Sequence, residues 1–380
     1  MKISILCFDL SSNAFGRAGL LAQALSGAYD VEIVGTSRRG GVWTPMEQIK
    51  IPVKKFTWSR YPSFNAIKKN ILNAIDGDII LASKLMPTSF GIGLQKKRTS
   101  GKPLVVDIDD WELGFFYHSG FWGRVGRFLN FSNPNGLPYV LAMERMVCHA
   151  DAVSVSNRFL QKKFGGVLLP HCRDTTILDP LKFNPDQIKE KMGFKDKKVV
   201  MFLGTPRSHK GLDDLLMAIK KIDNPNLNLA IIGVKNREEF LKRVDQSIRG
   251  RVVVLSPTPF NKLPELLSAA DIIAIPQRQT SDSVGQIPAR LFDAMAMAKP
   301  ILTTRVSDIP EVLDGCGYLV NPNEPSQLAD GIQYILTHYD EALVQGRAAR
   351  ERCKRMYDMS NLESSLKEII ERIAVRKGLK

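Results

Sequence analysis

The feature that most constrains the fold is the alternation of short, β-rich apolar runs with stretches of helical periodicity along almost the whole chain. This alternation is typical of parallel sheets whose strands are joined by helical crossovers. The expected strands of a first group lie within residues 2–8, 29–35, 77–83, 102–108 and 150–156, and those of a second group lie within residues 197–204, 227–233, 251–256, 270–276, 299–304 and 318–320. We therefore predict an α/β protein with two parallel sheets.

The domain organisation follows from the segment between these two groups. Residues 170–196 are polar, contain prolines and show no strand pattern, which predicts a linker. A chain of 380 residues is also too long for one compact core. We predict Rossmann-like domains at 1–175 and 176–357, followed by a helix in 358–380 with Ser360 as its N-cap and an apolar stripe. Open parallel sheets bind ligands beyond the carboxyl ends of their strands, so two such domains are expected to face a ligand across a cleft.

Composition excludes several classes of protein. The five cysteines are scattered without a CxxC pair, which argues against a disulfide framework and a zinc site. No apolar run reaches the length of a membrane span, and the first residues do not form a signal peptide, so we expect a cytoplasmic protein. The net charge of +14 indicates attraction to nucleic acid, anionic lipid or a phosphorylated substrate, and charge alone does not choose among them.

A basic loop opens the second predicted sheet. Residues 202–219, FLGTPRSHKGLDDLLMAI, predict a strand, a loop with Gly204, Arg207 and Lys210, and then an amphipathic helix. Basic side chains and free backbone N–H groups at such a position favour an anion, and Arg207 with Lys210 could hold a diphosphate. The loop is neither a P-loop nor a GxGxxG loop. The alternative is a solvated basic loop.

An acid stands inside an otherwise apolar predicted helix. In PARLFDAMAMAKPIL, Asp293 is the single polar side chain between Leu291 and Ala298, Arg290 precedes it by one turn, and Pro288 lies near the helix start. The acid is placed to accept hydrogen bonds from sugar hydroxyls while nearby N–H groups hold a phosphate. The alternative is a structural pair between Asp293 and Arg290 at spacing i, i+3.

Acids and aromatic residues follow the expected strand at 102–108. Asp107, Asp109 and Asp110 end this strand, so at least two of them are expected at the carboxyl edge of the sheet. A DxD pattern can hold Mg²⁺ or Mn²⁺ through oxygen ligands in a fold with one nucleotide domain, whereas this chain predicts two domains. The stretch 115–131 mixes aromatic residues with arginines. It suits an anionic bilayer or a lipid-linked acceptor, stacking on bases, or a buried helix with arginines that reach water.

Taken together, these motifs resemble family 4 retaining glycosyltransferases, which have the GT-B fold. The resemblance covers residues 140–335 well and the N-terminal part more weakly, and it rests on the basic loop ending in KG, IIG, AADIIAIP, PARLFDAMAMAKPIL, IPEVLDGCGYLVNPNEPSQLA and ADAVSVSNRFLQKKFGGVLLPHCRDT. It implies two Rossmann-like domains facing a cleft and a C-terminal helix that returns to the N-terminal domain.

The resemblance also implies roles for residues of the donor domain. Arg207 and Lys210, beside Gly204, fall where the family holds the donor diphosphate. Asp293 falls on the second glutamate of the family's Glu, seven residues, Glu motif, which contacts the ribose. The first glutamate, which touches the donor sugar, corresponds to Gly285, so this chain departs from the family there.

A related family pattern places backbone N–H groups and a basic side chain near phosphate. The residues that match it are Ile287, Pro288, Ala289 and Arg290.

Further roles are implied for the N-terminal domain. Gly16 and Arg17 occupy the turn that lies near the diphosphate in the family, although its double glycine is missing. Where the family commonly has a histidine near the reacting centre, Asp109 or Asp110 stands here. We predict that one of these acids accepts a hydrogen bond or a proton from the acceptor hydroxyl, the alternative being a structural pair with a neighbouring arginine. His118 could take the histidine's role.

The sequence therefore predicts a retaining hexosyl- or related glycosyltransferase of cell-surface polysaccharide, glycan or glycolipid assembly. Its partners would be a nucleotide-diphosphate sugar donor, a sugar or lipid-linked acceptor, and the anionic inner face of a membrane in peripheral contact. No metal, no cofactor and no nucleic acid are expected. Three alternatives remain: a nucleotide-sugar epimerase of the same fold, a basic nucleic-acid-binding protein, and a family member that has lost activity.

Overall fold

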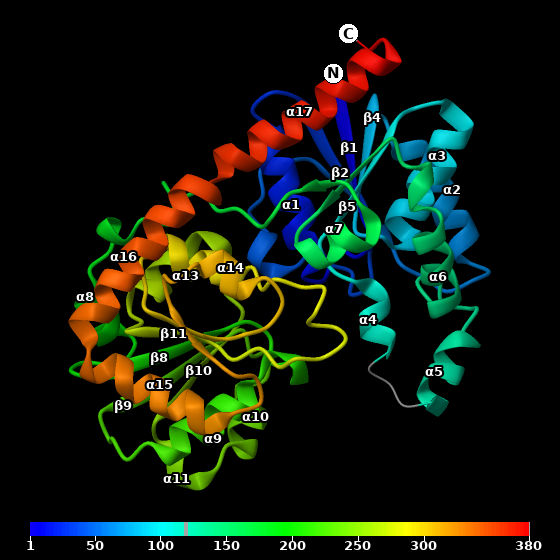
Figure 1. Ribbon diagram of the computed structural model, residues 1–380. Coiled ribbons are helices and arrows are strands. Elements are labelled where there is room, and N and C mark those ends of the chain that lie inside the picture. The colour runs from blue at the N-terminus through cyan, green and yellow to red at the C-terminus, as the bar shows by residue number, and fades with distance from the viewer. Residues whose placement is uncertain (118–120, 380) are drawn as a thin grey trace. The chain divides into compact units, whose positions relative to one another are not determined.

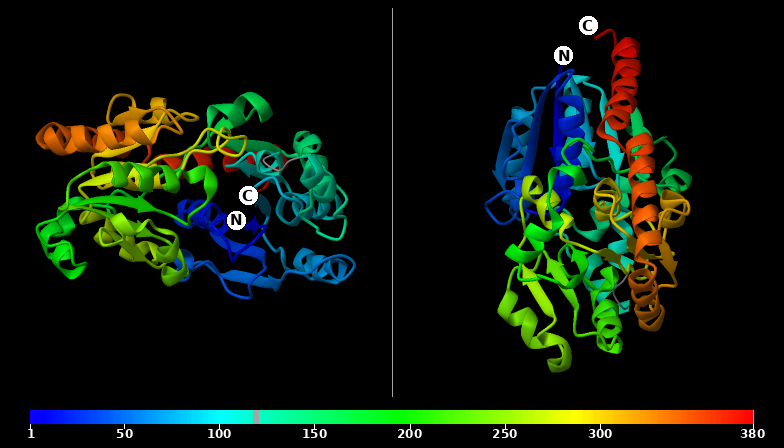
Figure 2. Two further views of the ribbon diagram at one scale, coloured as in Figure 1. Left: turned by 90° about the horizontal axis from the view of Figure 1, so that it is seen from below. Right: turned by 90° about the vertical axis from the view of Figure 1, so that its left-hand side faces the viewer.

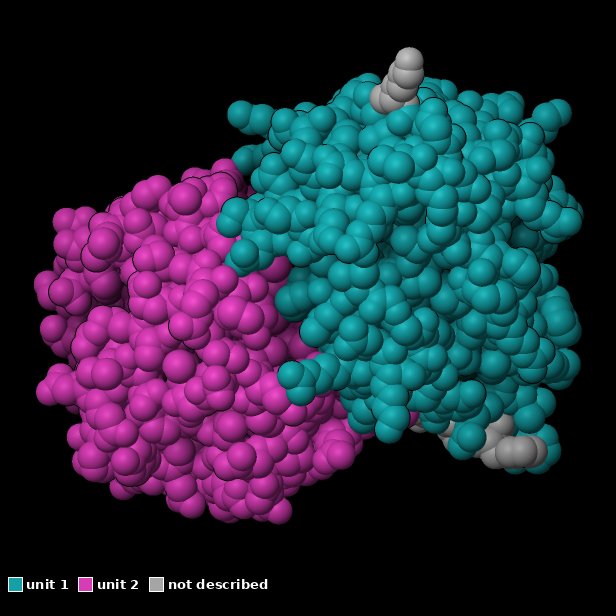
Figure 3. All heavy atoms as spheres, turned by 45° about the horizontal axis from the view of Figure 1, so that its top comes forward, with its two compact units in different colours: residues 1–170, 284–286, 359–380 teal, residues 171–283, 287–358 magenta. Residues whose placement is uncertain are grey.

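A computed structural model describes residues 1–117 and 121–379. They form two compact units (Figure 3). Unit 1 comprises residues 1–170, 284–286 and 359–380, and unit 2 comprises residues 171–283 and 287–358. These units are defined by their internal contacts. The sequence predicts where separately folding domains begin and end, which is a different property from contact within a unit. The predicted domain bounds therefore stay a prediction.

Unit 1 is built on a parallel sheet of seven strands within its described residues, in the order β3-β2-β1-β4-β5-β6-β7 (Figure 1). The strands are β1 (Lys2–Cys7), β2 (Asp30–Ser37), β3 (Val53–Thr57), β4 (Ile79–Ser83), β5 (Leu104–Ile108), β6 (Ala152–Val155) and β7 (Val167–Leu168). The five strands predicted for this sheet are confirmed. The edge strands β3 and β7 were not predicted.

Helices join these strands. They are α1 (Ala14–Leu25), α2 (Phe64–Ala74), α3 (Ile92–Ser100), α4 (Glu112–Tyr117), α5 (Phe121–Phe128), α6 (Leu137–Arg145) and α7 (Arg158–Phe164), with the short turns η1 (Thr44–Met46), η2 (Pro87–Gly91) and η3 (Val147–His149). Apolar side chains from α2, α3 and the strands, among them Ile71, Leu94 and Ile80, form one buried cluster. Because the central strands β1, β4 and β5 are buried, their register is fixed by burial.

The last helix, α17 (Met359–Lys377), belongs to unit 1 and lies beside α1 (Figure 1 and Figure 2). The apolar stripe predicted from the sequence is confirmed, because its members are buried: Leu362, Leu366, Ile369, Ile370 and Ile373. The predicted N-cap is wrong. The helix begins at Met359, and Ser360 lies inside its first turn, where its carbonyl accepts a hydrogen bond from Ser364 Oγ (2.8 Å).

Unit 2 is built on a parallel sheet of six strands within its described residues, in the order β10-β9-β8-β11-β12-β13. The strands are β8 (Lys198–Leu203), β9 (Leu227–Ile232), β10 (Val252–Leu255), β11 (Ile272–Ile275), β12 (Ile301–Thr304) and β13 (Tyr318–Val320). All six were predicted. Along β8, Val199 and Met201 enter one apolar cluster and Val200 and Phe202 enter another, as the alternation of side chains in a strand requires.

Helices cover both faces of this sheet. They are α8 (Pro185–Lys191), α9 (Leu212–Lys221), α10 (Arg237–Arg243), α11 (Gln246–Arg249), α12 (Leu263–Ser268), α13 (Arg290–Ala296), α14 (Ile309–Leu313), α15 (Pro325–Thr337) and α16 (Tyr339–Met356), with the turns η4 (Pro180–Lys182), η5 (Ser208–Lys210) and η6 (Phe260–Lys262). The helix predicted at Asp293 is α13, and it is shorter than its apolar run.

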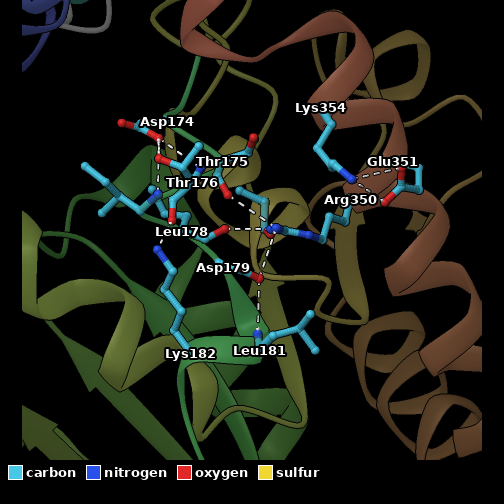
Figure 4. A network of polar contacts seen from close by, with 12 residues as sticks. Asp174, Thr175, Thr176, Leu178, Asp179, Leu181, Lys182, Arg350, Glu351 and Lys354 are labelled. Atoms are coloured by element: carbon cyan, nitrogen blue, oxygen red, sulfur yellow. Dashed lines mark hydrogen bonds and ion pairs between the residues drawn. The ribbon is translucent and has the colours of Figure 1, made fainter.

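The segment that opens unit 2 is held by one arginine of α16 (Figure 4). Arg350 donates hydrogen bonds to the carbonyls of Leu178 (2.6 Å) and Thr175 (3.3 Å) and to the carboxylate of Asp179 (3.1 Å). It also donates to the carbonyl of Ala296, the last residue of α13. A single guanidinium therefore fixes the predicted linker against two helices of the unit.

Within residues 1–117 and 121–379, none of the helices is both long and apolar enough to cross a bilayer.

Candidate functional site

Two cations converge at the carboxyl edge of the unit 2 sheet, where β8 ends. Gly204 has a φ of +120°, a conformation that other residues rarely adopt. A Cβ atom added to Gly204 would lie 3.1 Å from Lys210 Nζ and 3.5 Å from Arg290 Nη1. We call Gly204, Lys210 and Arg290 the cationic corner. Arg207 is exposed on the same loop, and its carbonyl accepts a hydrogen bond from Lys210 N (2.9 Å).

Arg290 is a buried cation without a carboxylate. Its residue is 6% exposed, its guanidinium lies 4.7 Å from the centre of the Phe202 ring, and its Nη1 donates to the carbonyl of Leu203 (2.8 Å). Within the described chain, its Nε and Nη2 atoms are buried and have no hydrogen-bond partner. Burial lowers the pKa of Arg290 to about 9, so the group stays mostly charged at neutral pH. A buried, incompletely paired guanidinium is costly unless an anion completes its shell.

The backbone of the basic loop has little freedom. Gly211 follows η5 with a φ of +67°, and a Cβ atom there would lie 1.7 Å from the carbonyl oxygen of Pro276. Only glycine fits this close approach between the loop and the end of β11. The position of Lys210 is therefore set by the residue that follows it.

Side chains also tie this loop to the segment after β11. His209 Nδ1 lies 2.9 Å from Asp282 Oδ2, and both residues are buried. Arg278 makes two hydrogen bonds with Asp214 of α9 (2.7 and 2.6 Å), and its backbone N donates to the carbonyl of His209 (2.8 Å). Burial alone would raise the pKa of Asp282, but hydrogen bonds from His209 and Thr280 lower it to about 2. The sequence did not predict these partners.

Asp293 has a different partner from the one considered in the sequence. It is 3% exposed and forms an ion pair with Arg173 Nε, while Arg173 Nη2 donates to the carbonyl of Ala289 (3.1 Å). The alternative pair between Asp293 and Arg290 is wrong, because the guanidinium of Arg290 lies over Phe202. A ribose contact by Asp293 and phosphate contacts by the backbone of residues 287–290 stay predictions. Ile287 and Pro288 are buried in unit 2.

In unit 1, a buried lysine holds the acids that follow β5. Lys84 Nζ lies 2.8 Å from Asp109 Oδ1 and 3.3 Å from Glu112 Oε1, and it also pairs with Asp110. Lys84 has a φ of +71° and directly follows β4, the neighbour of β5 in the sheet. We call Lys84, Asp109, Asp110 and Glu112 the carboxylate cluster. Lys84 is thus an ion-pair partner of both Asp109 and Asp110, and the alternative of a structural pair with an arginine stays a prediction.

The protonation of this cluster is shifted toward neutral pH. Burial raises the pKa of Asp109 to about 6 and that of Glu112 to about 7, although the ammonium of Lys84 opposes both shifts. Burial would lower the pKa of Lys84, but the three acids hold it well above its usual range. The cluster thus holds a proton that can leave or return near neutral pH.

Residues 284–286 complete unit 1 next to this cluster. Gln286 Nε2 donates to Asp110 Oδ1 (2.6 Å), and Asn157 Nδ2 donates to the carbonyl of Gly285 (3.0 Å). A Cβ atom on Gly285 would lie 2.5 Å from Trp111 Cβ. Gly285 is therefore packed too tightly to carry the side chain that the family has at this position.

Gly16 and Arg17 lie in the first turns of α1. The Arg17 guanidinium makes two hydrogen bonds with Asp107 (2.8 Å each) and others with the carbonyls of Leu169 (2.9 Å) and Pro170 (3.2 Å). Arg17 is 2% exposed. The carboxylate of Asp107, the first acid of the DxD pattern, is therefore already paired with Arg17. The donor contact predicted for Gly16 and Arg17 stays a prediction.

The aromatic stretch forms a helix with exposed side chains. On and just after α5, Trp122 is 81% exposed and Leu129 is 62% exposed, and Arg124 and Arg127 are also exposed. The alternative of a buried helix is therefore wrong. His118 lies outside the described residues.

Comparison with known proteins finds similarity over parts of the chain. Residues 197–338 match the family model of group 1 glycosyl transferases. A GDP-mannose-dependent alpha-(1-6)-phosphatidylinositol monomannoside mannosyltransferase of Mycolicibacterium smegmatis is 27% identical over 225 residues, which is 55% of this chain and 59% of that protein. A D-inositol 3-phosphate glycosyltransferase of Corynebacterium diphtheriae is 28% identical over 181 residues, 44% of this chain and 41% of that protein. The matches thus span less than two thirds of these relatives.

Solved structures share the fold over nearly the whole chain. Sucrose-phosphate synthase of Thermosynechococcus elongatus has a TM-score of 0.78 at 15% identity, covering 99% of this chain and 100% of that one. WaaG, a glycosyltransferase involved in lipopolysaccharide biosynthesis, has a TM-score of 0.70 at 17% identity, with 97% and 99% covered. The protein has the GT-B fold, with two Rossmann-like parallel sheets, and the resemblance to GT-B glycosyltransferases is confirmed.

Proposed function

We propose that this protein is a glycosyltransferase that moves a sugar from a nucleotide-diphosphate sugar to an acceptor hydroxyl with retention of configuration. The proposal extends to cell-surface glycan or glycolipid assembly. It is supported by the group 1 match over residues 197–338 and by similarity to a mannosyltransferase whose name specifies a GDP-mannose donor. A solved neighbour with a TM-score of 0.75 at 16% identity, covering 98% of this chain and 100% of that chain, contains UDP-glucose.

The observation that carries the proposal is the cationic corner. Lys210 and Arg290 approach the same point above Gly204, and Arg290 has two buried nitrogen atoms without partners among the described residues. A diphosphate supplies the charge and the acceptor oxygens that these nitrogens lack. As the bond between the sugar and the diphosphate breaks, negative charge grows on the leaving group, and preorganised cations stabilise it most at that moment.

The carboxylate cluster supplies the acid–base part of the proposed reaction. Asp109, whose pKa is raised to about 6 by burial, is mostly ionised at neutral pH and more basic than an exposed aspartate. It is the group we propose to accept a hydrogen bond or the proton of the acceptor hydroxyl. Lys84 is a positioning residue, because it fixes Asp109 and Asp110 in one orientation.

The first experiment measures donor binding. Calorimetric titration of the wild-type protein with UDP, GDP, UDP-glucose and GDP-mannose should reveal binding of at least one nucleotide. Lys210→Ala should weaken that binding by about tenfold or more, because a charge-assisted contact is lost. Lys242→Ala, an exposed lysine of α10, is the matched control and should bind as the wild type does. Absence of binding to all four compounds would contradict the proposal.

The second experiment addresses the reaction itself. Turnover of the bound donor with candidate sugar and lipid-linked acceptors should release the nucleoside diphosphate. Proton NMR of the anomeric centre of the product should show the configuration of the donor sugar. A product with the inverted anomeric configuration would contradict the proposed retention. Consumption of the donor without any acceptor would favour an epimerase.

We further propose that the protein acts at the anionic inner face of a membrane, in peripheral contact. Trp122, Phe128, Leu129 and Phe131 are exposed large apolar side chains on or just after α5, at 81%, 46%, 62% and 52%. Arg124 and Arg127 accompany them, as in helices that lie in a bilayer interface. Such a position would give access to a lipid-linked acceptor.

Vesicle sedimentation tests this contact. The protein should sediment with vesicles of phosphatidylcholine and phosphatidylglycerol and less with phosphatidylcholine alone, because the arginines add electrostatic attraction. Combining Trp122→Ala with Leu129→Ala should reduce sedimentation severalfold. Leu181→Ala, which removes a leucine of unit 2 that is 92% exposed, should not. Equal sedimentation of all variants would contradict the role of α5.

A further inference from the structure

A second residue of unit 2 is buried with unsatisfied hydrogen-bonding atoms. Gln277 is 1% exposed, and within the described chain neither its Oε1 nor its Nε2 has a hydrogen-bond partner. A buried amide without partners costs free energy on folding, because water bonded to it in the unfolded chain. Such a group in a native protein suggests a hydrogen-bond partner from outside the chain, such as a ligand.

The backbone around Gln277 is firmly held, so the side chain is not simply caught in a loose loop. Its N–H donates to the carbonyl of Ile275 (2.9 Å), and its carbonyl accepts from Thr304 Oγ1 (2.6 Å). The preceding Pro276 contacts Gly211, and the following Arg278 donates from its N–H to the carbonyl of His209 (2.8 Å). Gln277 is thus anchored between the end of β12 and the basic loop that carries Lys210.

Two residues hold most of the buried side-chain atoms of unit 2 that lack hydrogen-bond partners among the described residues. In the described part of this unit, five buried side-chain nitrogen and oxygen atoms lack hydrogen-bond partners, and four of them belong to Gln277 and Arg290. The fifth is the hydroxyl oxygen of Tyr318. Gln277 and Arg290 stand at the two ends of the segment between β11 and α13. β11 lies next to β8, at whose end the cationic corner is found.

We propose that Gln277 is a specificity-determining residue that binds an uncharged polar group of the donor. This inference rests on the proposed function. Arg290 offers only donors and suits phosphate oxygens, whereas an amide offers two N–H donors and one acceptor oxygen. Its complement is a neutral group that both donates and accepts. In a nucleotide sugar, that chemistry is present in the hydroxyls of the transferred sugar and in the nucleoside, whose base has an amide edge and whose ribose has hydroxyls.

The experiment uses Gln277→Met, which keeps an unbranched side chain of similar length and removes both polar atoms. Gln333→Leu, on the exposed face of α15, is the control. The ligands are inorganic pyrophosphate, UDP, GDP, UDP-glucose and GDP-mannose, each titrated by calorimetry. Gln277→Met should leave the affinity for pyrophosphate unchanged and weaken binding of the preferred nucleotide sugar by about tenfold, the effect of losing a buried hydrogen bond.

The ligands separate the two sources of the neutral group. If Gln277→Met weakens the nucleotide sugar and leaves the nucleoside diphosphate unchanged, the amide binds the sugar. If both weaken to the same extent while pyrophosphate does not, the amide binds the nucleoside, at its base or at its ribose. Unchanged affinity for all ligands, or an equal loss that includes pyrophosphate, would overturn the proposal.

Thermal unfolding without ligand supplies an independent measurement. Because the free protein gains nothing from the amide, the unfolding midpoint of Gln277→Met should equal or exceed that of the wild type. A marked decrease, in this variant and in Gln277→Leu, would show that the amide is satisfied inside the folded protein, for example by a fixed water, and would overturn the proposal. Failure of both variants to fold would have the same meaning. If the wild type binds no nucleotide at all, it is the proposed function that fails.

Discussion

The buried cations at the carboxyl edges of the two sheets differ in their partners. In unit 1, Lys84 is surrounded by the acids of the carboxylate cluster, and Arg17 is paired with Asp107. In unit 2, Arg290 is buried against an aromatic ring, and no carboxylate pairs with it among the residues that the structure describes. A cation that the fold already neutralises has its counter-charge inside the protein. We propose that the cation whose hydrogen bonds the fold leaves incomplete is the one that binds an anion from outside.

The largest effect expected from this comparison is on the stability of unit 1. Lys84→Met leaves three buried acids without their common counterion and should lower the free energy of unfolding by about 3–5 kcal/mol at pH 8. Urea denaturation measures this change. The control is Lys220→Met, since Lys220 pairs with Asp245 on the exposed surface and its loss should cost far less free energy of unfolding. If both variants lost a similar free energy of unfolding, Lys84 would be no more important for stability than a surface lysine.

Arg290→Met should behave in the opposite way. The ligand-free protein should unfold with the same or a higher free energy, because an incompletely paired buried cation is replaced by an apolar side chain. Nucleotide affinity should fall by about 10²-fold, since charge-assisted hydrogen bonds to the diphosphate are lost. Urea denaturation and calorimetry measure the two quantities. A variant that is destabilised and still binds nucleotide would show that Arg290 is structural, like Lys84.

A smaller effect is expected on how the free energy of unfolding depends on pH, and it should show whether Glu112 is the group that holds a proton in unit 1. Burial raises the pKa of Glu112 from 4.5 to about 7, so between these values the folded protein keeps a proton that the unfolded chain has released. The stability of the wild type therefore falls as pH rises through this window. In Glu112→Gln the part of this decrease that comes from Glu112 is missing, while the part from Asp109 remains, so the variant should gain about 3 kcal/mol relative to the wild type between pH 4.5 and 7.

Urea denaturation at several pH values measures that difference. Glu368→Gln, on the exposed part of α17, is the control and should show a constant difference over the same range. A constant difference for Glu112→Gln as well would mean that Glu112 is ionised throughout, and the raised pKa would be wrong.

Most of the fold could be predicted because its pattern is local. Buried strands such as 199–203 and 272–275 are continuous apolar runs that stand out from their surroundings. β3 was missed because its run, VKKFT, contains two lysines, and β7 because it has only two residues, both exposed. Edge strands bury little surface, so their composition carries little of the signal on which the prediction depends.

The candidate site was predicted only in part. Lys210 and Arg290 follow recognisable sequence motifs, and the structure brings them together at Gly204. Their partners were not predicted. Asp293 pairs with Arg173, which lies 120 positions away in the chain, rather than with Arg290 one turn before it. Helical spacing indicates which side chains could meet, but it does not decide between that contact and a competing one, here the ring of Phe202.

The position of Lys84 could have been inferred from topology. It directly follows β4, and the acids follow β5, the next strand in the sheet. Side chains at the ends of neighbouring parallel strands meet at one edge. The left-handed backbone conformation of Lys84 could not be predicted from the sequence, because glycine is the residue ordinarily expected in that conformation.

The return of α17 to unit 1 sets an order of events during synthesis on the ribosome. The helix against which α1 rests is translated only after all of residues 171–358, so unit 1 waits, with one apolar face uncovered, while the whole of unit 2 emerges. Unit 1 can therefore be completed only after α17 has been translated, although its strands are the first to be made.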